Sequence, residues 1–227
     1  MKNPAGQNSG FTLLELLIAI FLFSILTTTL FVSYRTLFVD TDDFESGIAH
    51  YEMAQACLAR ITNDLRSLHV NLPPLYVKPG FNSPPGDYRV VGATDFPGES
   101  TFSRLRFTST AHLAPGKSNQ RGIAEIRYYV HTGDEDQFVL RRSDTLYPYP
   151  SFEESNSDPV LCENIKAFQF KFYDDSAVEH ETWNSESEDF KYATPVAIGV
   201  ELEIGDEHTS RFFKTRITLP INRKPLE

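Results

Sequence analysis

The sequence predicts an α+β protein in which one long N-terminal helix precedes a domain built on an antiparallel β-sheet. Three observations support this fold class. An apolar run near the N-terminus continues into an amphipathic helical pattern, a segment rich in proline and glycine ends the helix, and alternating strand patterns follow. The 227 residues are 41% hydrophobic and 23% charged, which suits one globular domain with an appendage.

The apolar run follows a short polar leader, residues 1–10, whose only charge is Lys2. Residues 11–32 contain one charged side chain and no proline or glycine, and a helix of this length spans roughly 33 Å. A secretory signal has a different order, with its apolar stretch ahead of the cleavage site. We therefore expect residues 11–38 to form the transmembrane half of the helix and residues 39–227 to form the head. Acidic residues after the span weakly favour a head outside the cytoplasm.

Glu15 is the one charged residue within the apolar run. A carboxylate in a spanning helix costs about 2.5–3.5 kcal/mol on insertion scales, so it should have a partner or a role. If the chain were cut after Gly10, Phe11 would carry a new α-amino group. Glu15 could then pair with the free amine of a neighbouring subunit. The other interpretation is a carboxylate that reaches the headgroups or stays protonated.

The helical pattern continues in amphipathic form to about residue 70. One apolar face is expected to pack on the head, and charged residues fall mostly elsewhere. The residues of this predicted face are Phe44, Ile48, Tyr51, Leu58, Ile61, Leu65 and Leu68.

Residues 71–101 interleave prolines with glycines, which predicts a surface loop with a short strand near residues 88–91. After this loop, period-two alternation of apolar and polar residues predicts antiparallel strands within residues 103–220. The predicted strands are 103–109, 122–131, 137–142, 165–173, 195–204 and 209–219, with a hairpin joining the second to the third.

The net charge of −10 disfavours binding to nucleic acid, whose phosphates an acidic surface repels. The two cysteines, Cys57 and Cys162, lie far apart in sequence and form neither a disulfide framework nor a zinc pattern. Two interpretations stay open for them: two buried thiols, or one long-range disulfide formed in an oxidising compartment.

Acidic residues crowd between residues 174 and 189, without lysine or arginine. Carboxylates at this density can hold Ca²⁺, and Asp174 and Asp175 are the candidate ligands. The segment has no EF-hand loop pattern, so we favour a solvated loop.

No catalytic motif is present. The sequence has no H-E-x-x-H, no G-x-S-x-G and no phosphate-binding glycine loop, so we expect neither an enzyme nor a cofactor.

Residues 10–20, G-F-T-L-L-E-L-L-I-A-I, resemble the class III signal of type IV pilins and type II secretion pseudopilins. This resemblance implies that prepilin peptidase cuts after Gly10 and methylates Phe11, and that Glu15 is the assembly carboxylate. It also implies a pilin-like fold, an inner-membrane anchor and a periplasmic head.

Three further stretches, residues 57–68, 163–172 and 194–204, are similar to the J-type minor pseudopilin of type II secretion, as is the placement of Trp183 in a polar segment. This resemblance implies a structural subunit at the pseudopilus tip. Its partners would be the I- and K-type minor pseudopilins, the other pseudopilus subunits and the inner-membrane assembly platform. The alternative is a minor pilin of a type IV pilus.

Overall fold

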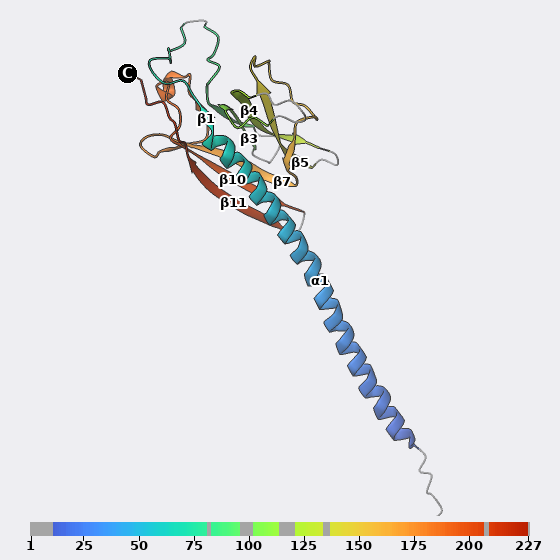
Figure 1. Cartoon of the computed structure of the whole chain (residues 1–227). Helices are drawn as coiled ribbons and strands as arrows, with labels where there is room; N and C mark the ends of the chain where they lie inside the picture. The colour runs from blue at the N-terminus through green and yellow to red at the C-terminus, as the bar shows by residue number, and fades with distance from the viewer. Residues whose placement is uncertain are drawn as a thin grey trace, which may run out of the picture. The chain divides into compact units, whose positions relative to one another are not determined.

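A computed structural model describes residues 11–80, 83–95, 102–113, 121–133, 137–206 and 209–226 (Figure 1). The side chains of residues 36–46 and of Asp95 lie outside this description. The chain divides into two compact units, Met1–Ala49 and His50–Glu227.

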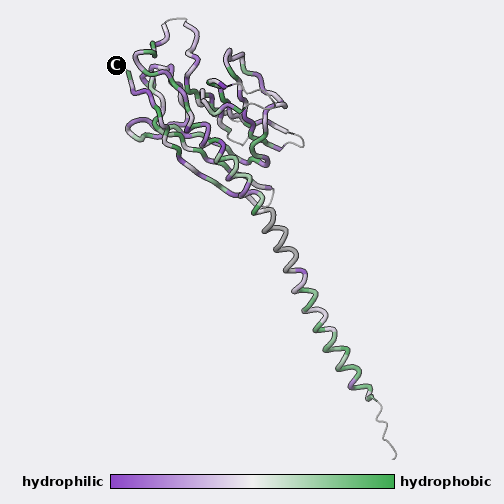
Figure 2. The backbone as a smooth tube through the Cα atoms, in the orientation of Figure 1, coloured by the Kyte–Doolittle hydropathy of each residue, from purple (hydrophilic) through white to green (hydrophobic). Residues whose placement is uncertain are grey.

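Helix α1, Leu13–Arg66, contributes to both units. In the first unit, Leu13–Arg35 is long and apolar enough to cross a membrane, with a mean hydropathy of 2.4. None of this segment is buried, and Figure 2 shows that hydrophobic colouring predominates along it. These features fit the expected transmembrane half, because a helix exposed and apolar all round suits a lipid environment.

The helix ends a few residues earlier than the amphipathic pattern predicts. Strand β1, Leu68–His69, follows Arg66 and pairs with residues 108–109 of the sheet. Leu68 is still buried, but as a strand residue, because a β-bridge to the sheet replaces the last expected turn of helix.

The second unit is built on one sheet, so the predicted α+β class is confirmed. In the described part of the chain the strands follow the order β11-β10-β7-β3-β4-β5-β6, with β1, β2, β8 and β9 joined to it at the sides. The remaining bounds are β2 Val91–Asp95, β3 Phe102–Ser109, β4 Ala124–Thr132, β5 Phe138–Leu146, β6 Val160–Cys162, β7 Ile165–Tyr173, β8 Glu179–His180, β9 Trp183–Asn184, the short 3₁₀ helix η2 Glu188–Phe190, β10 Ala197–Gly205 and β11 Ser210–Thr218.

Pairing in this sheet is antiparallel except at one junction. The predicted β4–β5 hairpin forms in continuous register, and so does the β10–β11 pair. Among the described strands, only β3 and β7 run parallel, and they meet at a single pair of residues, Phe102 and Phe168. The sheet therefore consists of two antiparallel halves joined at a narrow parallel seam.

The predicted surface loop at residues 71–101 is partly wrong. Val90 is fully buried, and β2 pairs with both β3 and β9, so its described C-terminal part belongs to the sheet. Gly92 explains how this strand fits, since a Cβ there would collide with the ring of Phe172. The composition predicts a loop because proline and glycine are frequent, but one glycine here permits close packing of two strands.

The buried face of α1 in the second unit differs from the predicted stripe. Ile61 and Leu65 are fully buried as expected, whereas Tyr51 is 52% exposed. Ala54 and Cys57 contact the core instead. Small side chains on this face let the helix lie close to the sheet, an effect that a count of large apolar residues overlooks.

Candidate functional sites

The first site lies at the start of α1. Gly10 is outside the described residues, and Phe11 is 86% exposed just before the helix. The Thr12 hydroxyl accepts a hydrogen bond from the backbone amide of Glu15 at 3.3 Å. In return, the Glu15 carboxylate accepts from the amide and the hydroxyl of Thr12, at 3.4 and 3.3 Å.

This reciprocal arrangement is a capping box, which satisfies two of the amide donors left free at a helix start. It places the Glu15 carboxylate at the positive end of the helix dipole, against Thr12, the residue that follows Phe11. The sequence analysis assigned Glu15 a role between subunits only, and the helix cap is a second role within the chain. The T-x-x-E spacing of residues 12–15 could have revealed it.

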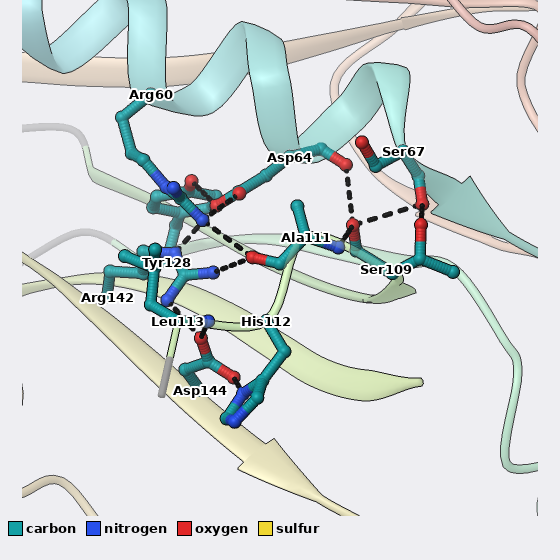
Figure 3. A network of polar contacts seen from close by, with 11 residues as sticks. Arg60, Asp64, Ser67, Ser109, Ala111, His112, Leu113, Tyr128, Arg142 and Asp144 are labelled. Atoms are coloured by element: carbon teal, nitrogen blue, oxygen red, sulfur yellow. Dashed lines mark hydrogen bonds and ion pairs between the residues drawn. The ribbon is translucent and has the colours of Figure 1, made fainter. Parts of the chain in front are cut away.

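The second site docks α1 on the sheet through a buried carboxylate (Figure 3). Asp64 is fully buried near the end of the helix. Its carboxylate accepts hydrogen bonds from Arg60 at 2.5 Å, from the Tyr128 hydroxyl at 2.5 Å and from Arg142 Nε at 2.6 Å. Tyr128 lies on β4 and Arg142 on β5, so one side chain joins the helix to two strands.

Asp144 extends this network on β5. Its carboxylate accepts from Arg142 Nη1 at 2.6 Å and from the amide of Leu113 at 2.8 Å, and it contacts His112 Nδ1 at 2.6 Å. Burial by itself would raise the pKa of Asp144, but the Leu113 amide, His112 and Arg142 outweigh burial and lower that pKa below 3.8. Asp144 is therefore ionised at neutral pH.

Burial and the neighbouring carboxylates together set the charge states of Arg142 and Tyr128. Burial would lower the pKa of Arg142, but the carboxylates of Asp64 and Asp144 outweigh burial and raise it, so the guanidinium stays charged. Burial raises the pKa of Tyr128 well above its usual value, and the adjacent Asp64 adds to the shift. Tyr128 is therefore a neutral hydrogen-bond donor at any physiological pH.

Backbone contacts complete the docking. The Ser109 hydroxyl donates to the carbonyl of Asp64 at 2.9 Å and to that of Ser67 at 3.0 Å (Figure 3). Arg60 and Arg142 both donate to the carbonyl of Ala111. The sheet thus provides a partner for the carbonyl of Asp64 in the last turn of α1 and for the carbonyl of Ser67 just beyond it.

The opposite face of α1 in this unit is exposed. Its side chains are small or polar apart from one aromatic ring, which suits contact with another helix. These exposed residues are Tyr51, Glu52, Gln55, Ala56, Ala59, Asn63 and Arg66.

The structure brings the two cysteines into the same part of the core. Cys57 on α1 and Cys162 at the end of β6 are each 1% exposed and are free thiols in the structure. The sequence alone leaves their pairing open, and the structure places both sulfurs in the same buried cluster.

The calcium candidates have other partners. The Asp174 carboxylate accepts from the amides of Ser176 and Val178, both at 2.9 Å, and contacts His180. Its hydrogen bond with His180, together with those amides, lowers the pKa of Asp174. Asp175 is exposed, and among the described residues no group of three or more His, Cys, Asp or Glu converges on one point.

Positively charged side chains line the same cavity as these two aspartates. Its volume is about 580 Å³, and Lys191, Arg223 and Lys224 contribute to its wall. Because these positive side chains oppose a bound cation, the calcium hypothesis stays a prediction that this geometry does not favour.

The sequence pattern did not predict which polar residues would contact Asp64. Tyr128 was assigned only to a strand, and Arg142 only to the end of one. Arg142 follows Phe138 and Leu140 at period two, and an arginine on the inward face of a strand is a signal that could have suggested a buried ion pair.

Comparison with known proteins agrees with this architecture in two steps. Residues 6–31 match the prokaryotic N-terminal methylation motif, which places the chain in the class of pilin-like proteins with a methylated N-terminus. Residues 41–215, more than half of the chain, match the family described as type II secretion system (T2SS), protein J. The chain therefore belongs to that family and is a minor pseudopilin of type II secretion. A comparison with curated proteins gives no match.

This membership gives the chain a structural role in a secretion apparatus, in contact with other pseudopilus components. It also fits a single N-terminal membrane anchor, since one apolar helix precedes the head. The alternative of a type IV pilus minor pilin is not favoured by the match.

Proposed function

We propose that this pseudopilin is a structural subunit of the pseudopilus tip, where it primes assembly for the export of folded proteins across the outer membrane. The observation that carries the proposal is the family match over residues 41–215, which covers most of the head. The partners would be the I- and K-type minor pseudopilins and the inner-membrane assembly platform. The apolar helix would anchor the chain in the inner membrane, with the head in the periplasm.

No catalytic role enters this proposal. The polar networks of the head hold α1 on the sheet, and Asp64 and Arg142 are 0% and 1% exposed, so neither can meet a substrate. The energy for extension would come from elsewhere in the apparatus.

The processing step follows from the N-terminal motif. Prepilin peptidase would cut after Gly10 and methylate Phe11, whose exposed position ahead of the helix fits access by an enzyme. Cleavage would turn the amide of Phe11 into a free amine next to the Thr12–Glu15 cap. Co-expression with prepilin peptidase, followed by mass measurement, should show loss of residues 1–10 and gain of one methyl group.

Glu15 would then act between subunits. Its carboxylate lies at the helix start, where it can leave the cap to accept the Phe11 amine of a neighbouring subunit. Glu15→Gln should be processed normally but should fail to co-purify with other pseudopilins. Thr12→Ala, which removes the hydroxyl of the cap and keeps the carboxylate, is the matched control and should retain assembly. Equal loss in both variants would mean that helix capping alone explains the need for Glu15.

The exposed face of α1 is the surface we assign to partner helices. Ala56 and Ala59 permit close approach of a second helix, and Glu52 offers a charge at its border. Glu52→Arg should weaken complex formation. Glu153→Arg makes the same charge change at an exposed position far along the chain and should leave the complex unchanged.

A co-purification tests the whole proposal. The chain is expressed with the I- and K-type minor pseudopilins of the same organism, extracted in detergent and analysed by size-exclusion chromatography with mass determination. A ternary complex is expected. Absence of a complex between folded partners would contradict the tip role and would favour the alternative, a minor pilin of a type IV pilus.

A further inference from the structure

The only two cysteines of the chain meet in the core of the head, although about 100 residues separate them. Cys57 lies on the face of α1 that packs on the sheet. Cys162 is the last residue of β6, the short strand at one edge of that sheet. A pair of thiols brought together from distant parts of a fold has the arrangement of a long-range disulfide.

Contacts around Met53 fix the position of Cys162. Its Sγ lies 4.0 Å from the carbonyl oxygen of Met53, and the amide of Glu163 lies 3.4 Å from the Met53 sulfur. In an α-helix the carbonyl of residue 53 faces the amide of Cys57, and helical side chains lean back toward the preceding turn. The Cys57 side chain therefore leans over the turn that Cys162 touches.

The two thiols also contact each other directly. A hydrogen bond with Cys57, and burial in addition, raise the pKa of the Cys162 thiol. In the folded state the Cys162 thiol is therefore protonated, and both thiols are shielded from water, so thiol reagents in solution do not reach them.

We propose that Cys57 and Cys162 are joined by a disulfide bond in the exported head. The inference rests on the proposed function for its compartment, because a periplasmic head folds in an oxidising environment. Both cysteines belong to the buried apolar cluster of the head, and the polar contact of Cys162 Sγ with the Met53 carbonyl is long, at 4.0 Å.

The bond forms by thiol–disulfide exchange with a dithiol–disulfide oxidase of the periplasm. The thiolate of one cysteine attacks the enzyme's disulfide and gives a mixed disulfide, and the second thiolate displaces the enzyme. One Sγ–Sγ bond forms and the enzyme's disulfide bond breaks. The two electrons and the two thiol protons of the cysteines pass to the enzyme, which leaves as a dithiol. Because the folded core excludes reagents, the exchange must precede the closure of β6 over the helix.

The bond would hold the weakest edge of the sheet. Strand β6 has three residues, and its pairing with β5 is interrupted by an irregularity between Leu140 and Arg141. A covalent link to α1 would fix this edge independently of its hydrogen bonds. A disulfide closing so long a loop should raise the thermal midpoint by roughly 10 °C or more.

The test uses the full chain, exported in a host with a periplasmic oxidase and purified in detergent. A maleimide is added under denaturing conditions, with and without reductant, and the adducts are counted by mass. We expect no adduct without reductant and two with it. The same chain from a strain lacking the oxidase should carry two adducts in both cases. Two adducts in the unreduced exported chain, or a covalent dimer between copies, would overturn the inference.

A protease-accessibility measurement on spheroplasts separates this inference from the proposed function. An accessible head with two free thiols would refute the disulfide and leave the pseudopilin role intact. An inaccessible head would refute the periplasmic placement, and the disulfide with it.

Variants distinguish the bond from mere packing of two small side chains. Cys57→Ala and Cys162→Ala should each abolish the effect of reductant on the thermal midpoint, and the double variant should match the reduced wild type. A Cys57→Ala chain as stable as the unreduced wild type would also overturn the proposal.

Discussion

Asp64→Ala should be among the most damaging single substitutions in the head. The wild-type carboxylate accepts from Arg60, Tyr128 and Arg142, and Arg142 is only 1% exposed. Without Asp64, the Arg142 guanidinium keeps Asp144 and one carbonyl as partners but cannot regain water at Nε. Removal of one partner of a buried ion pair costs about 3–5 kcal/mol.

This cost converts to a large thermal shift. For a domain of this size, each kcal/mol lowers the midpoint by about 2–4 °C, so the expected fall is roughly 6–20 °C. Circular dichroism of the purified chain during heating, with urea unfolding as a second probe, measures it. Tyr128→Phe is the graded comparison, since it removes one neutral donor and should cost about 1 kcal/mol.

A double variant checks that the loss of stability comes from the unpaired charge of Arg142. Asp64→Leu combined with Arg142→Met removes both charges and fills similar volume, and such replacements are often neutral. The double variant should therefore be more stable than Asp64→Ala. A midpoint for Asp64→Ala within about 2 °C of wild type would refute the reasoning, because it would mean that the network contributes less than about 1 kcal/mol.

Three other outcomes are expected. Because folding lowers the pKa of Asp144 from its ordinary value of 3.8, the ionised carboxylate stabilises the fold. This contribution is fully present above pH 3.8 and is lost as the pH falls through the lower pKa of the folded state. Asp144→Asn should flatten the fall of the thermal midpoint in this acid range, and an unchanged slope would contradict the assignment. Gly92→Ala should cost about 1–3 kcal/mol, because its methyl group collides with the Phe172 ring, whereas Gly80→Ala meets only the Ser83 hydroxyl, at 3.2 Å, and should cost little. Calcium should leave the thermal midpoint unchanged, and a rise abolished by Asp174→Asn would instead establish a cation site.

Period-two alternation predicted the strands well. Phe168, Phe170 and Phe172 were expected on one face of a strand, and all three are buried in the core. A strand has only two faces, so a run of alternating residues determines which one is buried. The hairpin of β4 and β5 followed from the same pattern joined to a turn sequence.

The helix face was predicted less well, because a helix can rotate by small steps. Large apolar residues placed Tyr51 inside, but Ala54 and Cys57 occupy that side. The orientation depends on Asp64, whose partners Tyr128 and Arg142 lie on strands far along the chain. No local pattern indicates that these three side chains meet, so a sequence-based assignment cannot fix the rotation.

The features at the N-terminus, in contrast, could be predicted from local sequence. The N-terminal methylation motif was visible in a few adjacent residues, since it is a continuous stretch of sequence. The capping box of Thr12 and Glu15 is equally local, and its spacing is enough to predict it.

The docking of α1 through Asp64 also sets an order of events during synthesis. A ribosome makes the whole helix before it makes Tyr128 or Arg142, which lie 64 and 78 residues beyond Asp64. Until those residues emerge, Arg60 is the only one of the three side-chain partners that the carboxylate can have. The apolar segment can therefore enter the membrane while the second half of α1 is still undocked, and a chain that stops before β5 lacks the Arg142 contact that completes the docking.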